Sequence, residues 1–400
     1  MAKILGIGNA VLDTILSVPH HPKEDEEIRA TQRMLSTGGN VNNTLYVLNQ
    51  LGHETAICST IAADGEAKQL LSGLKARNIT TEHIQSFIKG RTPNSFITLN
   101  AENGHRTIVH YRDLPEVGFD HFAKIEIENY DWLHFEGRNL DALPGMLNIA
   151  KTFLTNQPIS LEVEKPRAGI ESLFGQVNVL IFSHHYASAK GYQDGQALLK
   201  AIQEQAPNAN LVCTWGNKGV WFAPINGAVQ HIAAESISPI IDTLGAGDTF
   251  NAALIHNLIS QNSLEASVIA ANHLAAQKCR QPGLDNLLEI KTGETPLANF
   301  KQLSNAKTVI VDTDSGHKSI LLIKFEERVK AYENNCPHQD VPLNEAYKID
   351  VNPFEKTLKC SVHDAYFNIE DGVCIEGPCW DEALVTVDVR VEENGDIFLA

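Results

Sequence analysis

The sequence predicts an α/β fold, a mostly parallel β-sheet sandwiched by helices with a β lid at one edge, followed by a small all-β domain. Three observations predict this fold. Short apolar runs alternate with helical patterns over residues 1–288, and the segments 12–37 and 94–112 interrupt them with extended sequence. From residue 308 to 400 strand patterns follow one another. Strand–helix alternation is typical of parallel sheets that are covered on both faces.

The elements follow in order along the chain. The apolar start of the sequence is expected to be a first buried strand rather than a signal segment. Residues 289–307 carry turn residues and little periodicity, so they are expected to be a linker between domains 1–288 and 308–400. The strands expected first are Ile4–Gly8, Glu54–Ser59, Trp132–Phe135, Ile159–Val163, Val179–Phe182 and Leu211–Thr214, with helices at Asn42–Leu51, Ala67–Arg77, Leu143–Thr155 and Gln193–Gln205. The later strands are expected at Thr308–Val311, Ile320–Phe325, Val329–Tyr332, Ala383–Val391 and Ile397–Leu399.

Composition excludes several classes of protein. The chain has 400 residues, of which 43% are hydrophobic and 20% charged, as in globular proteins with a packed core. Its formal net charge of -17 disfavours a nucleic-acid partner. No apolar run approaches the roughly 20 residues that span a bilayer, so we expect no membrane association and a cytoplasmic location.

The first motif of chemical interest is Asp242-Thr-Leu-Gly-Ala-Gly-Asp-Thr-Phe250. Gly245 and Gly247 allow a tight turn, and a helix is expected directly after it, so unpaired N–H groups gather where an anion can bind. Asp248 at this turn can accept a proton from a substrate hydroxyl. The alternative is that Asp248 only caps the helix, but the flanking glycines favour the catalytic interpretation.

Two further motifs are weak when taken alone. The segment Gly38-Gly39-Asn40-Val-Asn-Asn43 combines glycines that permit close backbone approach with amide side chains suited to sugar hydroxyls. The segment Thr214-Trp-Gly-Asn-Lys-Gly219 follows an expected strand and can border nucleotide phosphates. Each is also compatible with an ordinary glycine turn.

Together, the three motifs in this order resemble those of the ribokinase-like carbohydrate kinases, the phosphofructokinase-B superfamily, and most of all its ketohexokinase branch. The resemblance extends over residues 3–288. Further matching segments are Pro22–Asp25, Glu27–Arg29, Arg106–Ile108, Trp132–Asn139, Glu162–Arg167 and Lys278–Cys279.

The resemblance implies that ATP, with Mg²⁺, phosphorylates the 1-hydroxyl of a ketohexose such as fructose. It implies a homodimer formed through the β lids, with Asp25 reaching the neighbour's sugar site. Asp248 is implied as the base, with Gly245, Ala246 and Gly247 as the anion hole and Arg106 approaching the transferred phosphate. Asp13, Gly39, Asn40 and Asn43 are implied at the sugar, and Trp215, Gly216, Gly219, Asn272 and Cys279 at the nucleotide.

Plainer interpretations of these residues stay open. Asp13 suits a solvated turn, Arg106 a charge on a strand surface, and Cys279 the core side of a helix. The Asn-x-x-Glu motif with which many relatives orient Mg²⁺ is absent, because that region reads Ser183-His-His-Tyr186. There is also no P-loop sequence, which excludes that mechanism.

Four of the seven cysteines lie in the last 65 residues, which indicates a metal site rather than a disulfide scaffold. Cys336-Pro-His338 and Cys360-Ser-Val-His363 supply two cysteine–histidine pairs. A Rieske [2Fe-2S] centre uses two thiolates for one iron and two imidazoles for the other. The stretch after His363 also resembles Rieske ferredoxins. A Cys₂His₂ zinc site is the alternative, although the short spacing of the first pair disfavours it.

The leading hypothesis is therefore a ketohexose kinase with a fused module for electron transfer or redox sensing, which would involve a redox partner protein. A second hypothesis is a redox carrier whose kinase fold only docks a partner. A third keeps the kinase and changes its acceptor to another sugar or a nucleoside, because the fold alone does not select the acceptor.

Overall fold

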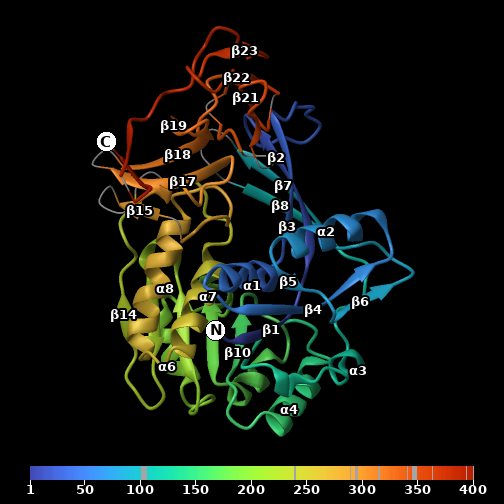
Figure 1. Cartoon of the computed structure of the whole chain (residues 1–400). Coiled ribbons are helices and arrows are strands. Elements are labelled where there is room, and N and C mark those ends of the chain that lie inside the picture. The colour runs from blue at the N-terminus through green and yellow to red at the C-terminus, as the bar shows by residue number, and fades with distance from the viewer. Residues whose placement is uncertain are drawn as a thin grey trace. The chain divides into compact units, whose positions relative to one another are not determined.

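The chain folds into two compact units in the computed structural model, Met1–Leu287 and Leu288–Ala400. The structure describes residues 1–100, 106–237, 240–288, 290–292, 296–313, 316–339, 341–344, 349–362, 364–392 and 394–399. Within these ranges, no helix is long and apolar enough to cross a membrane. Each unit has its own sheets and its own cores, and both are seen in Figure 1.

The first unit is built on a sheet with the strand order β14-β13-β12-β11-β10-β9-β1-β4-β5, and β6 also pairs with β4. The strands from β12 to β5 run parallel, whereas β13 and β14 add an antiparallel edge. The strands are β1 (Lys3–Ile7), β4 (Glu54–Ala62), β5 (Ile79–Thr80), β6 (Ile84–Phe87), β9 (Trp132–Glu136), β10 (Ile159–Val163), β11 (Val179–Ser183), β12 (Asn210–Thr214), β13 (Val220–Ala223) and β14 (Gln230–Ile232).

Helices cover both faces of this sheet because its strands are apolar on both faces. In β11, Leu180 and Phe182 join one core, while Val179 and Ile181 join the other. The first core packs against α3 (Phe119–Phe122), α4 (Leu143–Phe153) and α6 (Gly195–Ile202). The second packs against α1 (Asn40–Gln50), α2 (Gly65–Ala76), α7 (Ala246–Ile259) and α8 (Leu264–Lys278). The remaining helical segments are α5 (His184–Ala189) and the 3₁₀ helices η1 (Ile127–Asn129), η2 (Ile170–Gln176) and η3 (Gly216–Lys218).

A second sheet of the first unit forms the β lid. Its order is β3-β2-β7-β8, with β2 and β7 parallel and the outer pairs antiparallel. The strands are β2 (Val11–Val18), β3 (Gln32–Gly38), β7 (Asn94–Asn100) and β8 (Arg106–Tyr111). All of β8 is exposed. The lid lies in the two segments that break the strand–helix alternation of the sequence.

The second unit consists of small, mostly antiparallel sheets with the orders β15-β17-β18-β19, β16-β25-β24 and β20-β21-β22-β23. Strand β18 separates two cores, because Ile320 and Leu322 pack on one side and Leu321 and Ile323 on the other. The strands are β15 (Ile290–Thr292), β16 (Ala298–Asn299), β17 (Ala306–Thr313), β18 (Gly316–Phe325), β19 (Arg328–Glu333), β20 (Asp350–Asn352), β21 (Thr357–Lys359), β22 (Tyr366–Asn368), β23 (Cys374–Glu376), β24 (Val389–Val391) and β25 (Asp396–Leu399).

The predicted fold class, a helix-covered parallel sheet with a β lid and a small all-β domain, is confirmed. Two details differ. Of the strand expected at Ala383–Val391, only β24 is regular; Ala383 and Thr386 make isolated bridges instead. The stretch 289–307, expected to be a linker, includes β15 and β16, which pair with β17 and β25. The domain boundaries themselves stay a prediction.

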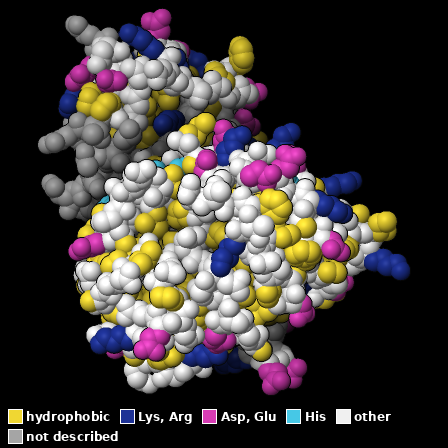
Figure 2. Space-filling view, turned by 90° about the horizontal axis from the view of Figure 1, so that it is seen from below, with side chains coloured by type: hydrophobic (Ala, Val, Ile, Leu, Met, Phe, Trp, Pro, Cys, Tyr) yellow, Lys and Arg dark blue, Asp and Glu magenta, His cyan; other side chains and the backbone are white. Residues whose placement is uncertain are grey.

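On the face drawn in Figure 2, charged side chains are scattered rather than gathered. In the space-filling view of Figure 2, acidic and basic side chains alternate on the visible face, with no broad basic patch among the described residues drawn there. This distribution is in keeping with the overall acidic composition.

Candidate functional site

Asp248 lies in the first turn of α7, at the point where the preceding glycine turn ends. Gly245 is the N-cap of the helix and has a left-handed φ of 79°, which glycine adopts without strain. The Asp248 carboxylate is buried and its Oδ2 accepts a hydrogen bond of 2.8 Å from Asn43 Nδ2. Burial raises the pKa of Asp248 to about 7, although the Asn43 hydrogen bond lowers it.

The turn that leads into α7 is held from the end of α8. Lys278 has no exposed surface, and its Nζ donates to the Asp242 carboxylate at 2.5 Å and to the Asp242 carbonyl at 2.9 Å. The same carboxylate accepts the N–H groups of Leu244 and Gly283 at 2.8 and 3.0 Å. These contacts of Asp242 and Lys278 therefore fix the backbone of the turn that precedes Ala246 and Gly247, the first residues of α7.

A buried carboxylate links two asparagines close to Asp248. Glu162, at the carboxyl end of β10, accepts hydrogen bonds from Asn40 Nδ2 at 3.2 Å and Asn251 Nδ2 at 3.0 Å. Burial, reinforced by the negative charge of Asp248, holds the pKa of Glu162 well above its usual range. On the neighbouring strand, Glu136 accepts the Val41 N–H at 2.8 Å. The start of α1 is thus fixed by two carboxylates of the central sheet.

Close backbone approach explains the diglycine before α1. At Gly39, which has a φ of 103°, a Cβ atom would lie 2.2 Å from the carbonyl oxygen of Asn9. At Gly38, a Cβ would lie 1.9 Å from an oxygen of Asp13. Asp13 is therefore packed against this turn, and burial raises its pKa to about 6 while a hydrogen bond from Ser95 lowers it. The solvated-turn interpretation of Asp13 is wrong, because the residue lies on β2 and is mostly buried.

The β lid contributes Arg106 to the same region. Its Nη1 donates to Thr243 Oγ1 in the glycine turn at 2.9 Å, so the guanidinium is next to the predicted anion hole. Asp25 behaves differently. It is exposed in the turn between β2 and β3, with a left-handed φ of 60°.

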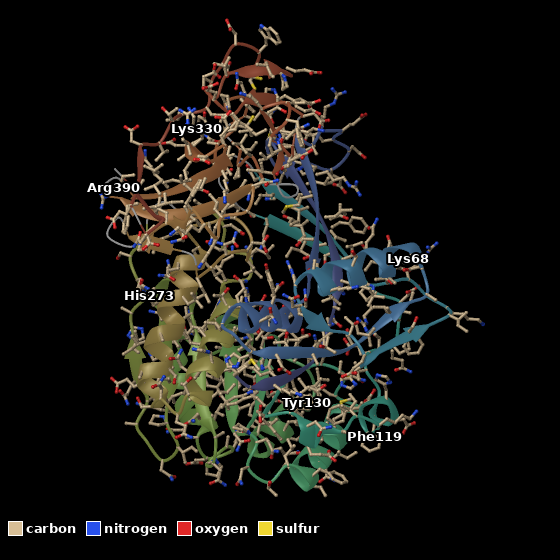
Figure 3. The ribbon with its side chains drawn as sticks, in the orientation of Figure 1. Lys68, Phe119, Tyr130, His273, Lys330 and Arg390 are labelled. Atoms are coloured by element: carbon tan, nitrogen blue, oxygen red, sulfur yellow. The ribbon has the colours of Figure 1, made fainter. Side chains whose placement is uncertain are left out.

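The residues predicted at the nucleotide lie around β12, β13 and α8. Trp215 precedes η3 and Lys218 lies over its ring, with Nζ 5.7 Å from the centroid. Gly216 and Gly219 both have positive φ, and a Cβ at Gly219 would meet the backbone at the end of β14, 2.1 Å from the Ile232 carbonyl oxygen. Asn272 Nδ2 donates to the Ala233 carbonyl at 3.0 Å. The adjacent His273, labelled in Figure 3, contacts Glu235 at 2.8 Å.

Cys279 caps α8 and is half-buried. Its carbonyl oxygen accepts the backbone N–H groups of Ile241 and Asp242 at 2.8 and 3.3 Å. Burial raises the pKa of its thiol, an effect that the Lys278 charge opposes. Through its backbone, Cys279 ties the end of α8 to the chain entering the glycine turn.

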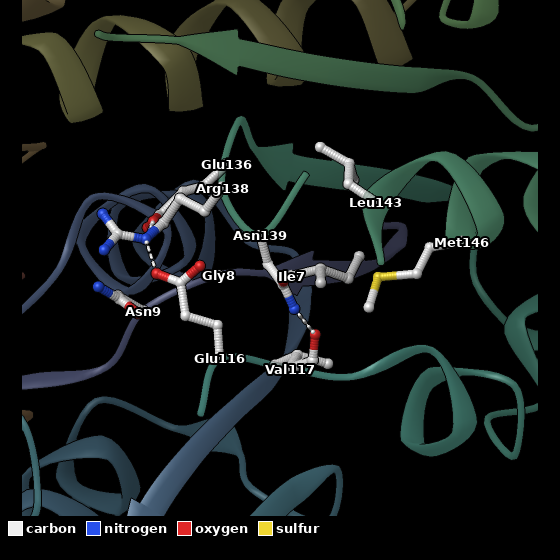
Figure 4. A pocket seen from close by; sticks show the side chains of 10 residues that line it. All are labelled: Ile7, Gly8, Asn9, Glu116, Val117, Glu136, Arg138, Asn139, Leu143 and Met146. Carbon is white, nitrogen blue, oxygen red and sulfur yellow. Dashed lines mark hydrogen bonds and ion pairs between the residues drawn. The ribbon is translucent and has the colours of Figure 1, made fainter. Parts of the chain in front are cut away.

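A small pocket lies beside Glu136, where β1 and β9 end (Figure 4). Arg138 in this pocket is already paired, with Nε 2.7 Å from Glu116 and 3.6 Å from Glu136. Asn139 donates to the Val117 carbonyl at 2.7 Å. Two carboxylates therefore already engage the Arg138 guanidinium, so this wall of the pocket offers no unpaired cation to an anionic ligand.

In the second unit, the two predicted cysteine ligands converge. Cys336 and Cys360 come from different loops, are fully buried and join the same core. A hydrogen bond with the Cys360 thiol and burial hold the pKa of Cys336 far above its usual range. Two adjacent buried thiols fit the cysteine-bound iron of a Rieske centre. His338 lies two residues after Cys336, half-buried, whereas His363 lies outside the described residues.

Sequence reasoning missed three site residues. Glu136 and Asn251 were not assigned a role, although a carboxylate at the carboxyl end of a parallel strand is a recognisable signal. Lys278 gave no such signal, because lysine on a helix is almost always exposed. Only packing shows that its ammonium is enclosed.

The fold and this site define the first unit as a carbohydrate kinase of the ribokinase-like class. Residues 1–291 match the pfkB family carbohydrate kinase profile, and residues 293–390 match the Rieske [2Fe-2S] domain profile. The chain belongs to the pfkB family of carbohydrate kinases and carries a Rieske domain. The family implies ATP and Mg²⁺, and the Rieske domain implies a [2Fe-2S] cluster.

Several known proteins are similar to this chain. Ketohexokinase of Mus musculus is 32% identical over 294 residues, which is 72% of this chain and 99% of that protein. Ribokinase of Staphylococcus aureus is 25% identical and covers 70% of this chain and 94% of its own length. Among solved structures, a putative ribokinase from Agrobacterium tumefaciens has a TM-score of 0.63 at 20% identity, covering 70% of this chain and 92% of its own. A nucleoside kinase from Methanocaldococcus jannaschii has a TM-score of 0.56 at 19% identity, covering 72% and 95%.

Proposed function

We propose that this kinase transfers a phosphoryl group from ATP to a hydroxyl of a ketohexose such as fructose, with Asp248 as the base. The observation that carries the proposal is the buried Asp248 carboxylate at the N-terminus of α7, oriented by Asn43. A carboxylate in this position accepts the proton of the attacking hydroxyl. The similarity to a ketohexokinase supports the acceptor class.

The remaining site residues have supporting roles in this proposal. Gly245, Ala246 and Gly247 present backbone N–H groups to the transferred phosphate, and Arg106 adds a positive charge beside them. Asp13, Gly39, Asn40 and Asn43 surround the sugar, and Trp215, Gly216, Gly219, Asn272 and Cys279 the nucleotide. Bound Mg²⁺ would neutralise phosphate charge. We assign Mg²⁺ no protein ligand.

The proposal includes a homodimer formed through the β lids. Leu35, Phe96, Ile108, Val109 and Tyr111 of the lid are each more than two-fifths exposed, an unusual density of apolar side chains for one small sheet. A second copy that covers this sheet would also bring its Asp25 turn to the neighbour's sugar site.

For the second unit we propose a Rieske cluster held by Cys336, His338, Cys360 and His363, which serves electron transfer or redox sensing with a partner protein. The cluster would supply a one-electron redox couple. The adjacent buried thiols of Cys336 and Cys360 support the thiolate half of this ligand set.

The kinase proposal is tested by measuring ADP formation with fructose, ribose and a nucleoside as acceptors. Asp248→Asn is expected to lower kcat about 10²- to 10⁴-fold because the base is lost. Asp194→Asn is the matched control, since Asp194 only caps α6 by accepting the Ala197 N–H. Equal kcat in wild type and Asp248→Asn would refute the assignment of Asp248 as the base. A higher kcat/KM for ribose or the nucleoside than for fructose would refute the assignment of a ketohexose as the acceptor.

A further inference from the structure

Two cysteines outside the predicted cluster ligands meet on one hairpin of the second unit. Cys374 begins β23, and Cys379 follows beyond the turn at Gly377 and Pro378. The two Sγ atoms are 3.1 Å apart, and both residues are only 2% exposed. The Cys374 thiol also lies 3.4 Å from the carbonyl oxygen of Glu376. Cys379 is thus placed to donate its S–H to Cys374.

The backbone of the hairpin holds this pair in position. The Cys374 N–H donates to the Glu382 carbonyl at 2.7 Å, and the Glu382 N–H donates to the Cys379 carbonyl at 3.0 Å. At Gly377, whose φ is 113°, a Cβ atom would lie 2.7 Å from the Cα of Ala365, so the turn is packed closely. Because a disulfide bond is about 2.05 Å long, side-chain rotation has to close only about 1 Å.

The pair lies beside a predicted cluster ligand. Cys336, Cys360, Cys374 and Cys379 belong to one core cluster. Cys379 also interacts with the Cys336 thiol directly. Hydrogen bonds and charge around the ligand sulfurs set the reduction potential of an iron–sulfur cluster. A change at Cys379 is therefore expected to reach the cluster through Cys336.

We propose that Cys374 and Cys379 are a dithiol that a small peroxide oxidises to a disulfide within the hairpin. The first sulfur attacks the peroxide oxygen and becomes a sulfenic acid with release of water or alcohol. The second sulfur then displaces that oxygen as water, so an S–S bond forms and two S–H bonds break. The two electrons and two protons of the dithiol reduce one O–O bond. The turn residues Glu376–Pro378, between the two cysteines in the sequence, and Trp380 after them, which is 69% exposed, face solvent.

The test uses the full-length protein with its cluster, treated with one equivalent of hydrogen peroxide, then unfolded, alkylated and mapped by mass spectrometry. We expect Cys374 and Cys379 in one peptide that lacks two hydrogen atoms and carries no alkyl group. Reduction with a dithiol should restore both alkylation sites. Cys58, Cys213 and Cys279 serve as internal controls that stay alkylated, and Cys379→Ser should abolish the linkage. Full alkylation of Cys374 and Cys379 after peroxide would overturn the proposal.

A second measurement tests the connection to Cys336, and this part rests on the proposed Rieske function. The midpoint potential of the cluster, followed by its EPR signal, is expected to differ between the dithiol and disulfide forms. Cys379→Ser should remove that difference. An unchanged potential with the disulfide present would overturn the coupling. Lack of any cluster signal in untreated protein would instead refute the Rieske proposal, while the peptide map would still decide the disulfide.

Discussion

At the scale of single residues, the proposed role of Asp248 as the base depends on the groups that surround its carboxylate. Burial raises its pKa to about 7, and the Asn43 hydrogen bond opposes this shift. The negative charges of Glu136 and Glu164 also raise the pKa of Asp248, and the positive charge of Arg106 lowers it. A base whose pKa lies near 7 is largely deprotonated at neutral pH and still binds the transferred proton strongly.

The pH dependence of activity follows from this arrangement. Asp248 accepts a proton only when it is ionised, so kcat/KM for the sugar is expected to rise as pH increases through about 7 and then to level off. Glu164→Gln removes a negative charge that raises the pKa, so it should move the rise to lower pH. Glu265→Gln, an exposed change on α8, is the control. A profile that keeps its midpoint in Glu164→Gln would contradict the assignment of this rise to Asp248.

Local sequence was most informative about individual glycines of the site. Gly39 was predicted because it permits close backbone approach and Gly245 because it permits a tight turn, and the structure places both at positive φ. Arg106 was left open between a surface charge and a site residue. Only the structure shows its contact with Thr243, because the lid strand and the glycine turn are far apart in the sequence.

Among the elements, α8 matters more to the glycine turn than its sequence indicates. Its last residue, Lys278, is enclosed and binds Asp242 through two oxygens. A buried ion pair adds little net stability, but loss of one partner leaves an uncompensated charge. The helix end therefore fixes the turn through electrostatics as well as packing.

Lys278→Met tests this role. We expect it to lower the free energy of unfolding of the kinase unit by about 3 kcal/mol, because the Asp242 carboxylate loses the cation that balances its charge. It should also lower kcat, since the turn N–H groups lose their fixed position. Urea unfolding and steady-state kinetics measure the two effects. Lys75→Met, at an exposed position in the last turn of α2, is the matched control.

The double variant Lys278→Met with Asp242→Asn separates the two contributions. It removes the unpaired charge, so stability should recover in part while kcat stays low. Wild-type kcat in the Lys278→Met variant would show that the ion pair does not position the turn.

At the scale of the whole molecule, the chain comprises two compact units, and each contains its own site. The residues assigned to the kinase lie within 1–287, and the predicted cluster ligands lie within 288–400. The kinase domain and the Rieske domain share a chain. Coupling between their sites would require two conformational states whose equilibrium is shifted by ligands or redox changes at both sites. We therefore expect the sites to work independently.

Cys336→Ser tests independence. Loss of one thiolate ligand should remove the Rieske EPR signal, because a cluster needs all its ligands. The ATP-dependent phosphorylation rate should stay within error of the wild type, with the cluster oxidised, reduced or missing. Cys374→Ser is the control that keeps the cluster. A kinase rate that falls together with the EPR signal would show coupling, and a persisting signal would exclude Cys336 as a ligand.

The sequence by itself determined the fold class, the order of the elements, the glycine turns and the two cysteine–histidine pairs. These features depend on local periodicity, on backbone conformations that glycine permits, and on ligand spacing. What only the tertiary structure decided is which distant side chains meet. Glu162 joins Asn40 to Asn251, the enclosed Lys278 pairs with Asp242, and Arg106 of the lid contacts Thr243. Such contacts form when sheet, helices and hairpins pack together and exclude water, and no spacing along the chain encodes them.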